Sequence, residues 1–243
     1  MNHALLTNPK TAEVRVNWTA VACFYTLACT ISYALRHVPN PTAGLLPYQT
    51  IFTYGLGPIV AALLTRQLFP AVAHTVTILG DRPRRTLLVV LLLLLLGVAF
   101  GVTNKRGVEP HLFGGLVVIS GLLYGFVEEM GWRGFLHDAL RPLPAWARVG
   151  LTALLWCGWH FTFMPDLSAV LGPRTPTLVV VVGFVLGAWG LGNAAERTRS
   201  VLVVACLHAA MNLPWVAVPW SGLALGVLAI GWTALLWTWQ KQP

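Results

Sequence analysis

The chain has 243 residues, of which 56% are hydrophobic and only 10% are charged, and it carries a formal net charge of +8. This balance excludes a water-soluble domain of this size, because soluble domains are about 25% charged. The basic residues stand singly or in small groups at the ends of apolar segments, which is typical of membrane topology signals and argues against a nucleic-acid surface.

Eight apolar segments follow one another along the chain, separated by Pro, Gly or charged residues. A membrane-spanning helix needs about 20 mostly apolar residues, so eight spans leave no room for a separate soluble domain. The predicted spans are residues 18–35, 48–64, 86–102, 112–136, 145–164, 176–191, 200–220 and 223–239. We therefore predict an all-α fold, a polytopic membrane bundle of about eight transmembrane helices.

The expected domain organisation is simple. Residues 1–16 form a polar, cytoplasmic N-terminal tail, and residues 17–240 form a single transmembrane domain whose catalytic motifs lie within 122–213. The first apolar segment is longer than a signal-peptide core and lacks a small-residue cleavage site, so we expect it to be retained as a helix.

The basic residues also predict how the bundle is oriented. With eight spans both termini lie on one face, and that face carries 12 of the 16 Lys and Arg residues, against four on the other. Under the positive-inside rule both termini are cytoplasmic. We expect a multi-pass protein of a prokaryotic cell membrane, because no appended domain or retention signal is recognised.

Two carboxylates lie in the middle of the fourth apolar segment, at Glu128 and Glu129. A charge at that depth costs at least about 2.5 kcal/mol, so an intramembrane carboxylate is a candidate functional residue. Arg133 lies four residues after Glu129 and on the same helical face, which predicts an ion pair. Successive helical positions diverge by about 100°, so Glu128 points elsewhere and remains available for chemistry.

Two further segments carry polar residues at a similar depth. His160 lies in the fifth segment, and His208 shares a helical face with Asn212 in the seventh. From the rise per residue, Glu128, His160 and His208 all come out ~12–18 Å from the cytoplasmic face, which predicts one shared site. The remaining histidines are expected to be solvated at the surface: His3, His37, His74, His111 and His137.

In chain order these motifs read Glu128-Glu129-x-x-x-Arg133, Trp156-x-x-x-His160 and His208-x-x-x-Asn212. The ordered set resembles the CAAX protease and bacteriocin-processing (CPBP, or Abi) family of intramembrane glutamic endopeptidases. The resemblance covers roughly residues 122–213. It departs from the commonest family pattern at Trp156, where Phe is usual and where an aromatic packing role is kept.

The resemblance implies that Glu128 and His160 activate water, while His208 and Asn212 stabilise the oxyanion. From their helical spacing, Glu129 and Arg133 are expected to support the site. We expect no cofactor and direct activation of water, because the sequence has no His-Glu-x-x-His helix. A divalent metal such as zinc, held by Glu128, His160 and His208, stays open as an alternative.

Other interpretations compete with this one. Cys157 and His160 share a helical face and would form a nucleophilic dyad, and buried Glu and His residues also occur in transporters and proton relays. A transporter usually has internal repeats or paired broken helices, which are missing here. The expected partners are membrane lipids and a membrane-associated peptide or protein, either a lipidated CAAX-like tail or a bacteriocin-like peptide as in bacteriocin immunity, and no nucleic acid.

Overall fold

The computed structural model describes residues 15–39, 49–164, 176–213 and 221–239. Within these ranges the chain is helical and contains no strand, which confirms the predicted all-α fold. The elements are α1 (Trp18–Arg36), α2 (Gln49–Leu68), α3 (Pro83–Phe100), α4 (Pro110–Gly131), the π-helical turn η1 (Trp132–Leu136), α5 (His137–Ala139), α6 (Ala145–His160), α8 (Thr177–Thr198), α9 (Val201–Asn212) and α10 (Ser221–Trp239).

Each of the eight predicted spans corresponds to one helix, but the helices differ in length. Among the described residues, four helical segments are long and apolar enough to cross a membrane: α1, α3, α8, and α4 continued through α5. The helices α6 and α9 are shorter than predicted, and the 12 residues of α9 extend only about 18 Å. Most of the predicted tail and the end of the seventh span, residues 214–220, lie outside the described residues.

Side chains cap the helices where the sequence leaves an apolar segment. The Asn17 side chain accepts a hydrogen bond from Ala20 N at 3.0 Å, and the Ser200 hydroxyl accepts one from Val203 N. Glu109 accepts from two backbone N–H groups at the start of α4, which lowers the pKa of its exposed carboxyl. Such caps satisfy N–H groups that the first helical turn cannot.

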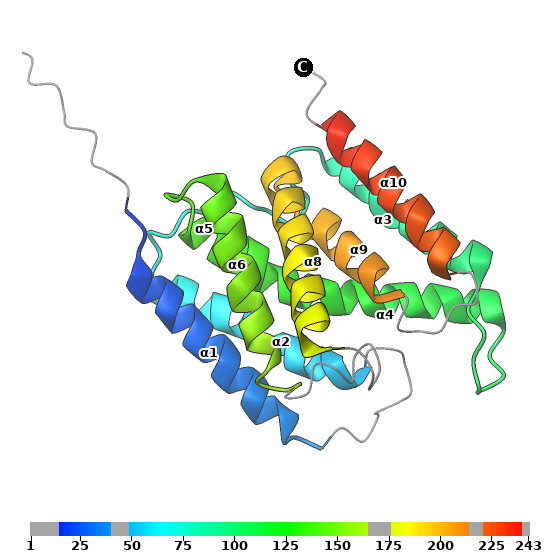
Figure 1. Cartoon of the computed structure of the whole chain (residues 1–243), viewed down its shortest axis with the longest axis horizontal. Coiled ribbons are helices and arrows are strands. Elements are labelled where there is room, and N and C mark those ends of the chain that lie inside the picture. Colours follow the sequence, from blue (N-terminus) through cyan, green and yellow to red (C-terminus); the bar gives the residue numbers. More distant parts are fainter. Residues whose placement is uncertain (1–14, 40–48, 165–175, 214–220, 240–243) are drawn as a thin grey trace, which may run out of the picture.

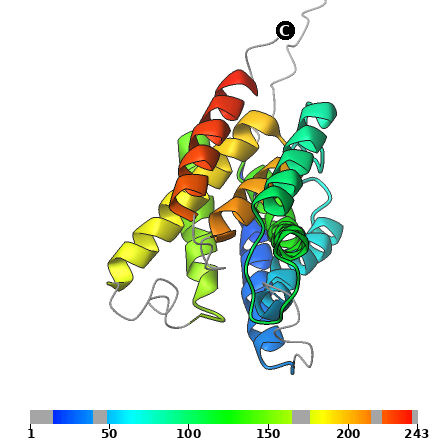
Figure 2. The same ribbon diagram turned by 90° about the vertical axis from the view of Figure 1, so that its right-hand side faces the viewer.

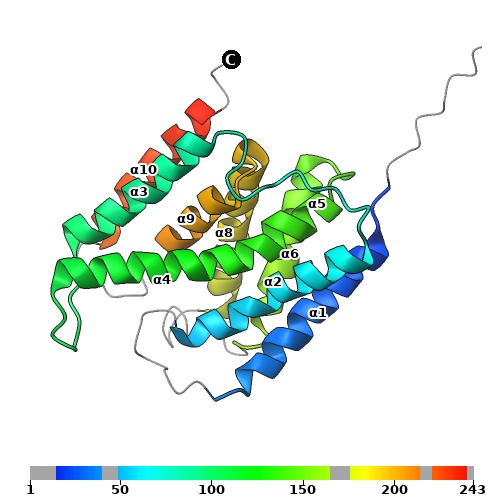
Figure 3. The ribbon, with the colours of Figure 1, turned by 180° about the vertical axis from the view of Figure 1, so that it is seen from behind.

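Helix α4 is the central element. It crosses the width of the molecule, with α3 and α10 towards one of its ends and α1 and α2 towards the other (Figure 1, Figure 3). In the view along the axis of α4, α3 lies next to α4, and α9 lies between α4 and α8 (Figure 2). It packs against α2, α3 and α9, while α6 packs against α8. The carboxylates near the end of α4 are therefore surrounded by other helices.

Glycines let these helices approach closely. A Cβ on Gly131 of α4 would lie 2.6 Å from the Pro58 carbonyl oxygen of α2, and a Cβ on Gly125 would lie 3.0 Å from the Ala205 carbonyl oxygen of α9. In a membrane, small residues at helix interfaces increase packing where the hydrophobic effect between helices is weak. These contacts bring α2 and α9 to both sides of the acidic pair.

The connection between α2 and α3 packs against the end of the bundle where α8 passes into α9. Thr77 N donates to Arg199 O at 2.9 Å, and Val201 N donates to Thr77 O at the same distance, which forms an isolated parallel bridge. The α2–α3, α5–α6 and α8–α9 connections therefore meet at one end of the molecule. Together with the helix ends beside them they carry eight arginines, and we call them the arginine-rich connections: Arg66, Arg82, Arg84, Arg85, Arg141, Arg148, Arg197 and Arg199.

Candidate active site

Glu128 is fully buried near the C-terminal end of α4. Its Oε2 accepts a hydrogen bond from the Trp156 indole Nε1 of α6 at 3.1 Å, and the Tyr124 side chain, one turn earlier on α4, hydrogen-bonds to the same carboxylate. Its Oε1 is also buried and has no hydrogen-bond partner among the described residues. One carboxylate oxygen is thus held in place while the other retains its acceptor capacity.

Glu129 is bound by Arg133 and His208 in a buried network. Arg133 Nη1 donates to both Glu129 oxygens, at 2.9 and 2.8 Å, so the ion pair predicted from the sequence is present. Arg133 Nη2 donates to the Ala188 carbonyl oxygen of α8 at 3.0 Å, and His208 Nδ1 lies 2.8 Å from Glu129 Oε1. This network joins α4, η1, α8 and α9 around one carboxylate.

His160 is the last residue of α6 and is buried among aromatic rings. Its Nδ1 lies 2.8 Å from the Trp156 carbonyl oxygen, which can only accept, so Nδ1 carries the hydrogen. In the neutral ring the lone pair is then on Nε2. The Phe184 ring of α8 packs edge-on at 4.6 Å between centroids and restricts the His160 ring.

His208 interacts with both buried carboxylates, Glu128 and Glu129. It interacts electrostatically with Glu128 and with His160 in addition to bonding Glu129. The Tyr124 and Trp156 rings contact its ring edge-on, with centroid distances of 5.5 and 5.9 Å. Glu128, His160 and His208, which the sequence places on three separate helices, therefore meet in one buried site.

The other residues singled out in the sequence lie at the edge of this buried site or outside it. Asn212 is the last residue of α9, half-buried and one turn beyond His208. Cys157 is buried near Tyr25 of α1. His137 was expected at the surface, and this prediction was wrong: the residue is 3% exposed, with its Nε2 2.8 Å from Glu196 Oε1. The α2–α3 connection and α8 cover that end of α4, which no local pattern indicates.

The turn directly after the acidic pair is a π-helix. The N–H of His137 bonds to the Trp132 carbonyl five residues earlier, which defines this wider turn. Single π turns inside α-helices are frequent at functional sites, because the extra residue rotates the side chains that follow. Here the turn contains Arg133, whose guanidinium reaches both Glu129 and α8.

Two contributors to the site were not recognised from the sequence. Trp156 was expected to act only as an aromatic packing residue, but its indole N–H holds Glu128 and its carbonyl holds His160. Tyr124 precedes Glu128 by four residues, a spacing that places both on one helical face. That spacing was the available signal for Tyr124, whereas the Trp156 contact depends on how α6 packs.

The alternative of a bound metal ion depends on how the possible donor side chains are arranged. Within the described residues, no group of three or more His, Cys, Asp and Glu side chains is arranged to hold a metal ion. Glu129, the carboxylate bonded to His208, is already paired with Arg133. As the structure describes them, Glu128, His160 and His208 are not arranged as the three ligands of the alternative metal site.

The region that contains Glu128, His160 and His208 is similar to a known protein family. Residues 110–214 match the family described as type II CAAX prenyl endopeptidase Rce1-like. The matched region is less than half of the chain, and the similarity is a property of that region. The match confirms the resemblance to the CPBP family, and the Rce1-like family implies a membrane protease, a hydrolase that acts on membrane-associated proteins. A search of curated proteins found no match to the chain.

Proposed function

We propose that the protein is a glutamate-dependent intramembrane endopeptidase in which Glu128 takes a proton from the attacking water. One observation carries this proposal: Glu128 Oε1 is buried and unpaired among the described residues, while Trp156 fixes Oε2. A fixed carboxylate oxygen with free acceptor capacity is what a general base requires. Glu129 has both oxygens bound to Arg133, so it supports the site rather than acting as the base.

His160 assists the same water. Its Nδ1–H is bound to the Trp156 carbonyl, so its Nε2 lone pair is available to accept a hydrogen bond. Because the indole of Trp156 holds Glu128 and its carbonyl holds His160, one residue positions both acceptors. Two acceptors with fixed orientation lower the cost of orienting water for attack on a peptide carbonyl.

His208 and Asn212 supply donors to the oxyanion that this attack creates. The Glu129 carboxylate, 2.8 Å from His208 Nδ1, stabilises positive charge on the ring and leaves its Nε2–H free to donate. The Asn212 amide lies one helical turn further along α9 and offers a second donor. Donors fixed at a developing oxyanion contribute about 10²–10³-fold in rate.

The substrate follows from the family and the setting of the site. The bond that is cleaved is a peptide bond in a membrane-anchored protein. The substrate we propose is a lipidated CAAX-like tail, and a bacteriocin-like peptide is the second class to test. Water is activated without a metal ion. The meeting of the arginine-rich connections at one end of the bundle supports cytoplasmic termini in a multi-pass cell-membrane protein.

The test uses purified protein in phosphatidylcholine vesicles and a fluorogenic CAAX peptide, with and without a farnesyl group on its cysteine. We expect cleavage of the farnesylated peptide, much slower cleavage of the matched unmodified peptide, and full activity with a divalent-metal chelator. Cleavage abolished by the chelator and restored by zinc would overturn direct water activation. No cleavage of either CAAX peptide or of bacteriocin-like peptides would overturn the peptidase proposal.

A further inference from the structure

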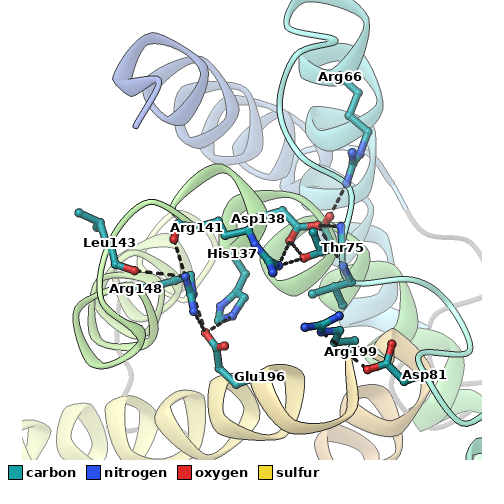
Figure 4. A network of polar contacts seen from close by, with 12 residues as sticks. Arg66, Thr75, Asp81, His137, Asp138, Arg141, Leu143, Arg148, Glu196 and Arg199 are labelled. Carbon is teal, nitrogen blue, oxygen red and sulfur yellow. Dashed lines mark hydrogen bonds and ion pairs between the residues drawn. The ribbon is translucent and has the colours of Figure 1, made fainter. Parts of the chain in front are cut away.

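A polar cavity of about 350 Å³ lies at the end of the bundle where the arginine-rich connections meet, apart from the candidate active site (Figure 4). Its walls come from the α2–α3 connection, the α5–α6 region and the end of α8. Its size is within the range of ligand pockets, about 300–1,000 Å³. The ionisable lining residues are His137, Asp138, Arg141, Arg148, Glu196 and Arg199.

The two carboxylates in this lining are already satisfied by the protein. Asp138 accepts hydrogen bonds from Thr75 N at 2.7 Å, from Val76 N at 3.1 Å and from the Thr75 hydroxyl. Glu196 is paired with Arg148 and with His137. Their negative charge is therefore used to hold the walls of the cavity together.

Two arginines in the lining retain unused donors. Arg141 is bonded to the Thr75 hydroxyl, and its Nη1 is 4.0 Å from Asp138 Oδ1, while the side chain remains 45% exposed. Arg199 is 47% exposed, and its contact with Asp81 is long, at 3.7 Å between Nε and Oδ2. Such exposed pairs contribute little, so both guanidinium groups can bind an anion bidentately.

His137 provides an independent observation at the same cavity. It is 3% exposed and lines the cavity, and its Nδ1 has no hydrogen-bond partner among the described residues. A buried polar atom without a partner is rare in proteins and needs an explanation. Because Nε2 donates to Glu196, Nδ1 donates to an anion only in the protonated ring, and an anion between the two arginines would stabilise that protonated form.

The position of the cavity identifies the source of the anion. In the sequence, Trp146 stands between the lining residues Leu143 and Arg148, and its side chain is 70% exposed. An exposed tryptophan at the end of an apolar helix favours the headgroup region of a bilayer. Clusters of arginine at that level attract anionic lipids. We propose that the cavity binds the phosphate of an anionic phospholipid headgroup, independently of the proposed peptidase activity.

Arg199 offers a variant that removes charge without harming the fold. It ends α8 in the left-handed region, with φ 50°, and is the one non-glycine residue of the described chain with positive φ. Glycine adopts this conformation without steric cost. Arg199→Gly should therefore unfold at a temperature no lower than wild type while weakening lipid binding.

The experiment is native mass spectrometry of the purified full chain with phosphatidylglycerol or phosphatidylcholine added at equal concentrations. We expect phosphatidylglycerol to bind preferentially, with affinity reduced about fivefold for each arginine lost in Arg141→Gln and Arg199→Gly. The matched control is Arg84→Gln, an exposed arginine at the start of α3 that does not line the cavity. It should bind the lipid like wild type.

Three results would overturn the proposal. The first is equal binding of the two lipids by the wild type. The second is undiminished phosphatidylglycerol binding by the folded Arg141→Gln/Arg199→Gly double variant. The third is complete displacement of the lipid by an equimolar amount of inorganic phosphate, which would assign the cavity to soluble phosphate.

Discussion

Breaking the buried pair between Glu129 and Arg133 should destabilise the protein more than removing both partners. Both side chains are fully buried, and Arg133 Nη1 binds both carboxylate oxygens. Arg133→Met leaves the carboxylate with His208, and Glu129→Gln leaves the guanidinium with the Ala188 carbonyl. An uncompensated buried charge costs about 3–5 kcal/mol, so each single variant should shift the unfolding equilibrium at least about 100-fold.

The double variant Glu129→Gln/Arg133→Met removes both charges, so its stability should be no lower than that of either single variant. The coupling energy of this cycle should therefore be at least about 3 kcal/mol, the loss expected for one single variant. The assay is reversible unfolding by sodium dodecyl sulfate in mixed micelles, followed by circular dichroism. Strictly additive losses, or single variants as stable as wild type, would refute the account of this pair.

Two further predictions concern how the site is built. Trp156→Phe keeps an aromatic ring and the backbone bond to His160 but removes the donor to Glu128, so kcat should fall about tenfold and stability by about 1–3 kcal/mol; an unchanged kcat would contradict this positioning role. Gly131→Ala would place a Cβ 2.6 Å from the Pro58 oxygen and should lower stability by about 1–3 kcal/mol. The matched Gly183→Ala, which meets no atom within 4 Å, should be neutral or stabilising; equal melting temperatures for the two variants would contradict the close approach of α4 and α2.

The sequence predicts much of this molecule because its strongest signals are local. Apolar runs and the residues that interrupt them locate every described helix of at least 12 residues, and the i, i+4 spacing predicts the Glu129–Arg133 pair. The ordered motifs also predict that Glu128, His160 and His208 share a site. These inferences need only helical periodicity and the cost of burying charge.

What the sequence does not predict depends on contacts between distant segments. His137 is buried because Glu196, 59 residues later in the chain, pairs with it under the α2–α3 connection. The Trp156 indole reaches Glu128 only because α6 packs beside α4, and periodicity carries no information about that contact. The π turn at residues 132–136 is equally invisible to an α-helical pattern.

The central claim, that Glu128 is the base, is tested most directly by the turnover of Glu128→Gln on the farnesylated CAAX peptide in vesicles. The control is Glu109→Gln, which changes an exposed carboxylate at the start of the same helix. Since a general base contributes about 10²–10⁴-fold, we expect kcat of Glu128→Gln to fall at least about 100-fold and that of Glu109→Gln to stay near wild type. A folded Glu128→Gln protein that retains wild-type turnover would contradict the account.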